Sequence, residues 1–121
     1  MPELPEVQGL VDAIGEQFTG HWVARAELGS LSALKTYDPP LAALADATLL
    51  GTGRRGKFLV LDFADSAGEP FHVVVHLSRA GWIHWRTSER LAPLRPGKGP
   101  VALRLTWRDD SGSTSVLDVT E

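Results

Sequence analysis

The sequence contains no cysteine, which excludes disulfide bonds and thiolate metal sites from this chain. Four histidines remain as metal ligands, and only His72 and His76 have a spacing that suits one shared ion. On a β-strand these two side chains would share a face but lie about 13 Å apart, too far to bind the same ion. The residues therefore predict no metal site in this chain.

Long hydrophobic runs are also missing. No stretch of about 18 apolar residues occurs, so the sequence predicts no membrane-spanning helix. The N-terminus lacks the basic segment followed by an apolar segment that is typical of a secretory signal. The expected location is therefore the cytoplasm.

The chain has no excess of positive charge. Its 12 Lys and Arg residues face 15 Asp and Glu residues, which gives a net charge of −3. A strong nucleic-acid binder is usually basic, so the chain as a whole is not expected to grip DNA tightly by itself. A local basic face is still compatible with this balance, and Arg54, Arg55 and Lys57 are its candidates. With 121 residues, 43% of them hydrophobic, the chain is long enough for one domain with a real core.

Hydrophobic periodicity predicts one substantial helix, over residues 5–18. Its apolar side chains recur at the 3.6-residue spacing that places them on one face: Val7, Leu10, Val11, Ile14 and Phe18. Gly20 is typical of the position that follows a helix end. Asp38, which two prolines follow, is suited to cap a second short helix that continues to about Ala45.

The rest of the chain predicts β-structure. Alternating and apolar stretches indicate seven strands, at residues 21–28, 48–53, 57–63, 71–77, 82–86, 101–107 and 114–120. Residues 29–38 and 87–100 are expected to form loops, the second rich in proline. Seven strands behind one long helix favour the α+β class: a two-layer antiparallel β-sandwich with an N-terminal helix and a second short helix.

The first seven residues, MPELPEV, carry the strongest chemical signal. After removal of Met1, the nitrogen of Pro2 is a secondary amine that titrates near pH 8 and is partly nucleophilic at neutral pH. Its attack on a sugar C1′ would form an iminium, a covalent intermediate of the Schiff-base type. Pro5 fits the first turn of a helix, whose positive end favours ionised Glu3 and Glu6. Taken alone, the string is more typical of a Pro/Glu cap on an amphipathic helix, because short motifs often match by chance.

This string resembles the N-terminal signature of the formamidopyrimidine-DNA glycosylase / endonuclease VIII family. A second segment, GRRGKFLVL at residues 53–61, is similar to the family's turn and strand, which carry a lysine implicated in catalysis and DNA contact. Lys57 matches that lysine. By itself the segment is more typical of a solvated charged turn, although its glycines would let the backbone approach a phosphate closely. The presence of both segments favours the functional interpretation.

A third segment, HLSRAG at residues 76–81, resembles the family loop in which 8-oxoguanine enzymes place a wedging methionine. Arg79 stands at that position here, so the lesion range, purine or pyrimidine, is left open. Lys98 lies where some members place DNA-contacting histidines. The resemblance implies the following DNA-binding residues: Arg54, Arg55, His76, Arg79 and Lys98.

The resemblance implies a base-excision repair enzyme that removes oxidised bases from damaged double-stranded DNA and cleaves the abasic site. The base must be flipped out of the stack to expose C1′. Pro2 would be the nucleophile, Glu3 the general acid, and Lys57 would bind phosphate and assist proton transfer. Glu6 would support them by orienting the amine. These steps need no metal or organic cofactor.

Residues 1–121 are expected to form the catalytic N-terminal domain of a longer, monomeric protein associated with the nucleoid. Family members continue into a helix–two-turn–helix domain and, in many cases, a zinc finger, so the isolated domain is expected to be weakly active or inactive. The alternative is a non-catalytic nucleic-acid or protein interaction module with the same fold. The negative net charge and Arg79 favour that module, whereas Pro2, Glu3 and Lys57 together favour the enzyme.

Overall fold

The computed structural model describes residues 3–29, 41–77, 81–87 and 101–120. Their elements, in chain order, are α1 (Leu4–Phe18), β1 (Trp22–Leu28), the 3₁₀-helix η1 (Leu41–Leu44), β2 (Thr48–Arg55), β3 (Phe58–Ala64), β4 (Pro70–His76), β5 (Trp82–Thr87), β6 (Val101–Arg108) and β7 (Thr114–Thr120). The predicted helix is confirmed, and so are the seven predicted strands, whose ends differ by at most two residues. The two predicted loops at 29–38 and 87–100 lie almost entirely outside the described residues.

Helix α1 begins where the sequence predicts it. Glu3 is the N-cap with an extended backbone (φ −77°, ψ 160°), and Pro5 follows in the first turn, where it needs no hydrogen-bond partner. The carboxylate of Glu6 accepts a hydrogen bond from the backbone N–H of Glu3 at 3.1 Å. The chain leaves the helix at Gly20, whose φ of +90° suits a residue without a Cβ. The five apolar residues of the predicted face are all buried.

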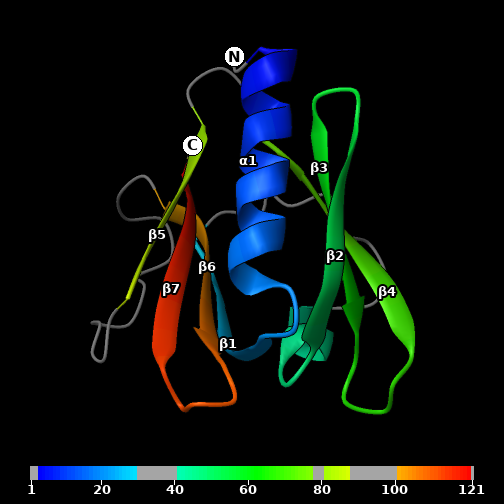
Figure 1. Ribbon diagram of the computed structural model, residues 1–121, viewed down its shortest axis with the longest axis vertical. Helices are drawn as coiled ribbons and strands as arrows, with labels where there is room; N and C mark the ends of the chain where they lie inside the picture. Colours follow the sequence, from blue (N-terminus) through cyan, green and yellow to red (C-terminus); the bar gives the residue numbers. More distant parts are fainter. Residues whose placement is uncertain (1–2, 30–40, 78–80, 88–100, 121) are drawn as a thin grey trace.

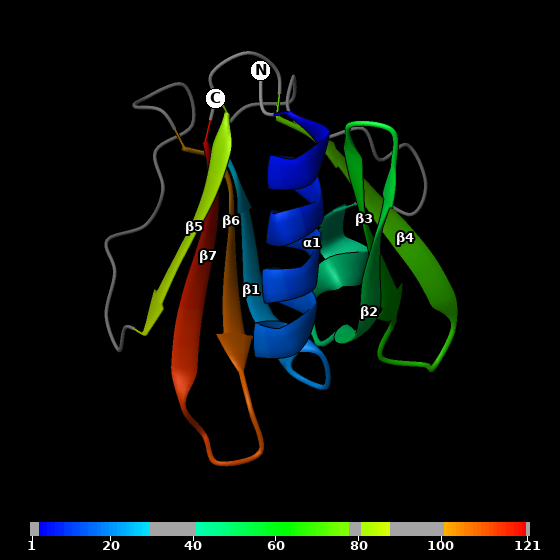
Figure 2. The same ribbon diagram turned by 45° about the horizontal axis from the view of Figure 1, so that its top comes forward.

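The strands form one antiparallel sheet in the order β4-β3-β2-β1-β6-β7-β5. Strands β1 and β2 are joined by the single pair Trp22–Thr48, whereas the other neighbours pair along most of their length. The sheet therefore divides into a β2–β3–β4 half and a β1–β6–β7–β5 half, which curve around α1 (Figures 1 and 2). The α+β class is confirmed, and the two layers of the predicted sandwich are corrected to two halves of one continuous sheet.

The predicted second short helix is not seen as an α-helix among the residues that the structure describes. Residues 41–44 form only the 3₁₀-helix η1, and the rest of the expected segment before it, residues 38–40, lies outside the described residues. The helix does not continue past residue 44 because the backbone turns there to pair with β1. The N–H of Asp46 donates to the carbonyl of Val23 at 2.8 Å, and Val23 donates to Ala47 at 2.8 Å. Asp46 itself has a φ of +63°, which no helix contains.

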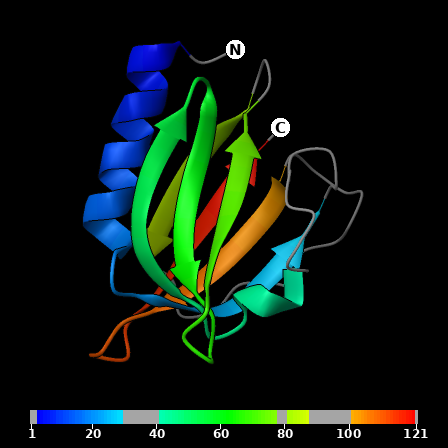
Figure 3. The same cartoon turned by 90° about the vertical axis from the view of Figure 1, so that its right-hand side faces the viewer.

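One core joins the helix to both halves of the sheet. The fully buried rings of Phe18 and Trp107 stack with centroids 4.8 Å apart, and Trp107 stacks on Phe63 at 6.0 Å. These three rings come from α1, β6 and β3, so the two halves of the sheet pack against each other beside the helix; in Figure 3 the β2–β3–β4 half lies in front of the other half, with α1 at the left. Among the described helices, none has the length and apolar character needed to cross a bilayer.

Candidate active site

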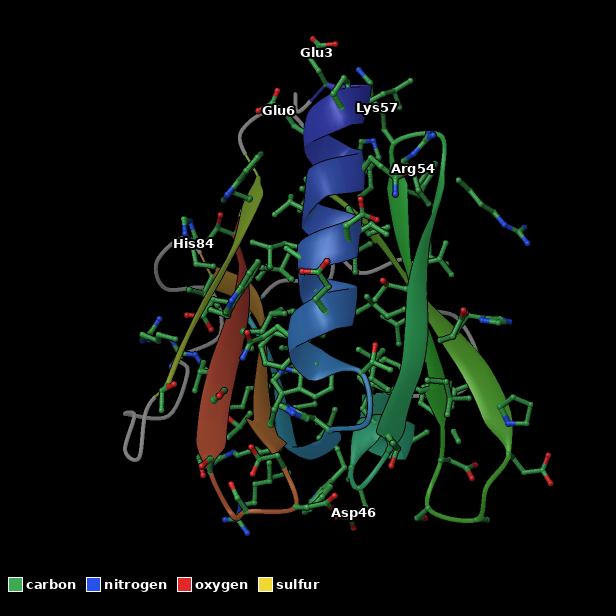
Figure 4. All side chains as sticks on the ribbon, in the orientation of Figure 1. Glu3, Glu6, Asp46, Arg54, Lys57 and His84 are labelled. Atoms are coloured by element: carbon green, nitrogen blue, oxygen red, sulfur yellow. The ribbon has the colours of Figure 1, made fainter. Side chains whose placement is uncertain are left out.

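Two of the predicted catalytic residues, Glu3 and Lys57, lie at one end of the molecule. The N-terminal end of α1 lies beside the tip of the β2–β3 hairpin, and Glu3, Glu6, Arg54 and Lys57 come together there (Figure 4). His84 on β5 lies away from this group in the same view. Residues more than 45 positions apart in the sequence are thus brought to one surface by the packing of α1 on β2.

The two glutamates take different places at the helix end. Glu3 is the N-cap and Glu6 is in the first turn, where its carboxylate is engaged with the backbone N–H of Glu3. Both side chains are exposed, and both lie at the N-terminal end of the helix. This arrangement fits a supporting role for Glu6, since its carboxylate helps to fix the residue that follows Pro2.

The hairpin tip holds Lys57 in a two-residue turn. Arg55 pairs with Phe58 as the last pair of the ladder, so Gly56 and Lys57 alone connect the strands. Gly56 has a φ of +58°, the conformation that tight hairpin turns require and that glycine adopts without strain. Lys57 is partly buried at this position. The GRRGK segment is therefore a rigid turn beside the helix end, as its glycine indicated.

Arg54 connects this turn to the helix. Its Nε donates a hydrogen bond to Oε1 of Gln8 at 3.0 Å, and its Nη1 donates to the carbonyl of Gly56 at 3.0 Å. Gln8 in turn donates from Nε2 to Oδ1 of Asp12 at 2.9 Å. Sequence reasoning missed Gln8, and the four-residue spacing of Gln8 and Asp12 was the only local signal of this network.

Arg55 and His76 lie on a second surface, next to the tip. Strand register places Arg55, Phe58 and His76 in one row across β2, β3 and β4 on the outer face of the sheet. The rings of Phe58 and His76 are 4.9 Å apart, and Phe58 is 41% exposed. The structure thus brings two predicted DNA-binding residues together around an exposed aromatic ring that sequence reasoning missed.

This row opens onto a shallow groove of about 550 Å³. The groove is lined by Gly53, Arg54, Arg55, Phe58, Val60, Asp62, His72 and Val74. At its far end Asp62 and His72 form a hydrogen-bonded pair at 2.5 Å. The groove is therefore cationic beside the hairpin tip, apolar along its floor and capped by a carboxylate–imidazole pair.

Three predicted site residues, Pro2, Arg79 and Lys98, lie outside the described residues, and their roles stay predictions. Gly81, which follows Arg79 by two positions, is described. A Cβ added to Gly81 would clash with the carbonyl oxygens of Leu77 and Thr120, so only glycine fits there. Among the described residues, no three His, Asp or Glu side chains lie close enough together to hold a metal ion.

The sequence matches the family model described as the N-terminal domain of formamidopyrimidine-DNA glycosylase over residues 1–119. The chain belongs to this family. The resemblance inferred from MPELPEV and GRRGKFLVL is thereby confirmed.

Similar proteins include formamidopyrimidine-DNA glycosylases of three bacteria. The Mycolicibacterium vanbaalenii protein is 38% identical over 92 residues, which cover 67% of this chain and 31% of that protein. The Corynebacterium jeikeium protein is 37% identical over 83 residues, covering 67% and 27%. The Rhizobium etli protein is 33% identical over 99 residues, covering 81% and 31%. The chain therefore matches less than a third of the length of these relatives.

Solved structures confirm the fold. The chain superposes on Lactococcus lactis formamidopyrimidine-DNA glycosylase bound to AP-site DNA with a TM-score of 0.75 and 22% identity, covering 99% of this chain and 41% of that one. A complex of the same enzyme with DNA containing N7-benzyl-Fapy-dG gives a TM-score of 0.76 at 23% identity, covering 99% and 40%. At this level of identity the likeness establishes the architecture alone.

Proposed function

We propose that residues 1–121 form the catalytic N-terminal domain of a bifunctional glycosylase and abasic-site lyase that acts on oxidised bases in double-stranded DNA. The observation that carries this proposal is that Glu3 and Lys57 lie at the same end of the molecule. Glu3 is the residue directly after Pro2 in the chain. Family membership supports it, because the relatives are glycosylases by name. The whole protein would be a longer monomer that works in the cytoplasm at the nucleoid.

The first chemical step forms a bond from the Pro2 nitrogen to C1′ of a flipped nucleotide while the glycosidic bond breaks. The bond from C1′ to the ring oxygen breaks next, and the opened sugar remains attached to Pro2 as an iminium. The released base and the ring oxygen each take up one proton, of which one comes from the Pro2 nitrogen and the other from Glu3, which acts as general acid. Loss of a proton from the carbon next to the iminium then expels the 3′ phosphate, which Lys57 binds.

The position of Glu3 suits this acid role. It is the residue next to the amine, it caps α1, and its side chain is exposed rather than packed into the core. Lys57 is held at the neighbouring hairpin tip, from which a cation can reach the phosphate of the same nucleotide. The nucleophile and the acid would then come from the start of the chain, and the cation that binds the phosphate would come from the β2–β3 turn. The packing of α1 on β2 determines the distance between these two parts.

The decisive experiment is borohydride trapping of the full-length protein on duplexes that contain 8-oxoguanine, an oxidised pyrimidine or an abasic site. Intact mass first establishes that Met1 has been removed, because a retained methionine would convert the Pro2 nitrogen into an unreactive amide. A covalent adduct mapped to Pro2 is expected, and the lesion that traps best identifies the substrate class. No adduct from protein with a free Pro2 would favour the binding-module alternative.

Two variants separate the proposed roles. Pro2→Gly retains a terminal amine but makes it primary and flexible, so trapping should fall sharply. Glu3→Gln retains the size of the side chain and should slow base release while DNA affinity stays the same. Unchanged trapping by Pro2→Gly would refute the nucleophile, and full glycosylase activity of Glu3→Gln would remove Glu3 from the acid role.

A further inference from the structure

The two arginines of the β2–β3 tip point to opposite faces of the sheet. Successive side chains of a strand alternate between its faces, and Arg55 shares the outer row with Phe58 and His76. Arg54 therefore faces the other way, toward α1, where its guanidinium meets Gln8. Adjacent residues of the same type are thus placed in different surroundings, which indicates that they have different tasks.

The contacts between α1 and β2 form a seam that ends at Arg54. Toward the middle of the helix, the Thr52 hydroxyl donates to the carbonyl of Val11 at 2.8 Å. One turn nearer the N-terminus, the Arg54 side chain reaches Gln8. Thr52 and Arg54 lie two residues apart on the same face of β2 and contact helix positions three residues apart. Arg54 thereby extends the attachment of α1 from the core to the catalytic end of the molecule.

The second bond of Arg54 reaches the turn itself. Nη1 donates to the carbonyl of Gly56, the residue directly before Lys57. Since Gly56 lacks a side chain and the turn has only two residues, this bond restrains the backbone that carries Lys57. The planar guanidinium presents several N–H donors in a fixed geometry, so one side chain can hold the helix and the turn together. A lysine ammonium is a compact group that cannot span both acceptors.

We propose that Arg54 is a positioning residue, which together with Gln8 holds the Gly56–Lys57 turn against the N-terminal end of α1. Its task is to set the place of Lys57 relative to Glu3 and the terminal amine, rather than to bind a DNA phosphate. This inference rests on the proposed function, because its consequence is expressed in the lyase reaction.

The test uses full-length protein with a free Pro2 and measures the single-turnover rate of borohydride trapping on abasic DNA, with protein at saturation. The variants are Arg54→Gln, Arg54→Lys, Gln8→Leu and the double variant Arg54→Gln with Gln8→Leu. Gln8→Leu should lower the rate about three- to tenfold, the equivalent of one lost hydrogen bond, and the Arg54 variants, which lose the bonds to both Gln8 and Gly56, should lower it at least as much. The double variant should be no slower than the slower single variant, since both changes break the same link.

Two matched controls accompany these variants. Gln17→Leu makes the same substitution at an exposed position on α1 near its other end, and its rate should equal that of the unchanged protein. Arg25→Gln removes one exposed arginine from the other half of the sheet, where its side chain is 61% exposed, and should also have no effect on the rate.

DNA affinity as a function of salt separates positioning from phosphate binding. Loss of a phosphate contact reduces the slope of log K against log salt by about one. Gln8→Leu should leave this slope unchanged while slowing the reaction, and Arg54→Lys should react as slowly as Arg54→Gln although it keeps the charge. If Arg54→Lys and Gln8→Leu both react at the rate of the unchanged protein, Arg54 is a phosphate contact and the proposal is overturned.

Hydrogen exchange of the Lys57 amide provides a readout that does not depend on activity. Arg54→Gln and Gln8→Leu should both accelerate this exchange, whereas Gln17→Leu should not. Normal trapping by the unchanged protein with no effect of either variant would overturn the positioning role and leave the proposed function intact. Faster exchange in both variants, combined with no adduct from the unchanged protein, would support the positioning role of Arg54 and overturn the proposed function.

Discussion

The β2–β3 and β6–β7 hairpins have their turns at opposite ends of the molecule (Figure 1) and carry opposite charges. The first turn is flanked by Arg54, Arg55 and Lys57, and the second contains Asp109 and Asp110. Local potential depends on where charges lie rather than on their sum. A net charge of −3 is therefore compatible with a cationic β2–β3 turn, because the charges of the chain are unevenly distributed.

The arginines of the two hairpins also differ in how they are neutralised. Arg104 on β6 donates from Nε and Nη2 to the two carboxylate oxygens of Asp118 at 2.7 and 3.1 Å, and Arg86 approaches at 3.5 Å. The hydrogen bond with Asp118 raises the pKa of Arg104 above its ordinary value. Arg54 instead meets the neutral oxygens of Gln8 and Gly56. Thus these two contacts of Arg54 are with uncharged groups, whereas Arg104 is paired with a carboxylate.

The largest predicted effect tests this compensation. Asp118 is only 5% exposed, and the Arg104 side chain only 12%, so Asp118→Asn removes the carboxylate that hydrogen-bonds a largely buried cation and leaves Glu27 as the other carboxylate that acts on it. We expect the free energy of unfolding to fall by about 3 kcal/mol, measured by urea denaturation followed through tryptophan fluorescence.

Asp62→Asn is the matched control, since the Asp62 side chain is 42% exposed and its partner His72 is exposed as well. An exposed pair of this kind contributes less than about 1 kcal/mol. Equal losses for the two variants would show that Asp118 is no more important to stability than a surface carboxylate.

A smaller effect tests the attachment of α1 to the β2–β3 hairpin. A Cβ added at Gly15 would lie 2.6 Å from the Thr52 hydroxyl, which is itself bonded to Val11. A Cβ at Gly9, in the same helix, would meet nothing within 4 Å. We expect Gly9→Ala to stabilise the protein by up to about 1 kcal/mol through helix propensity. Gly15→Ala should be about 1–2 kcal/mol less stable than Gly9→Ala, because the Thr52 bond must break.

Thermal unfolding of the two alanine variants under the same conditions measures this difference. Equal midpoints would mean that Thr52 rotates away at no cost and that the seam between α1 and β2 is looser than the hydrogen bond implies.

The next prediction compares arginines of the two halves in DNA binding. Arg55→Gln should weaken the binding of abasic duplex by full-length protein about tenfold and reduce the salt slope by about one. Arg86→Gln removes the same charge from a side chain that already contacts Asp118, and should leave both quantities unchanged. Fluorescence anisotropy at several salt concentrations provides the measurement, and identical slopes for both variants would contradict the assignment of the β2–β3 tip as the DNA-facing end.

The smallest effect concerns the acidic turn of the β6–β7 hairpin. The pKa of Asp109 is held below its ordinary value of 3.8, chiefly because the Ser111 hydroxyl donates to Oδ1 at 2.6 Å. A carboxyl whose folded pKa is lowered stabilises the fold above its unfolded pKa, and this contribution is lost as the pH falls through the folded pKa. Ser111→Ala should therefore raise the pKa of Asp109 toward 3.8, as an NMR titration can measure.

Ser113→Ala serves as the comparison, because Ser113 reaches Asp109 through its backbone N–H, which the substitution retains. Its effect on the pKa of Asp109 should be smaller than that of Ser111→Ala. A larger effect would mean that the turn is shaped by the pair of serine hydroxyls rather than by Asp109.

Features that depend on neighbouring residues were predictable from the sequence. The apolar face of α1 follows from the spacing of Val7 to Phe18, and the cap from Glu3, Pro5 and Glu6, because helix periodicity and capping involve residues three or four positions apart. The seven strands followed from alternation in the same way. The catalytic candidates Glu3 and Lys57 were identified by short motifs, and the structure brings them to one end of the molecule.

Only the tertiary structure decided which surfaces these elements share. The link from Arg54 to Gln8 spans 46 positions, and the row of Arg55, Phe58 and His76 depends on the register of three strands. The segment after residue 40 ended as η1 because its backbone paired with Val23, a partner that no local pattern reveals. Helix and strand periodicity depend on local sterics and burial, which involve residues close together in the chain. The partner of the exposed Arg54 depends instead on how α1 packs against the β2–β3 hairpin.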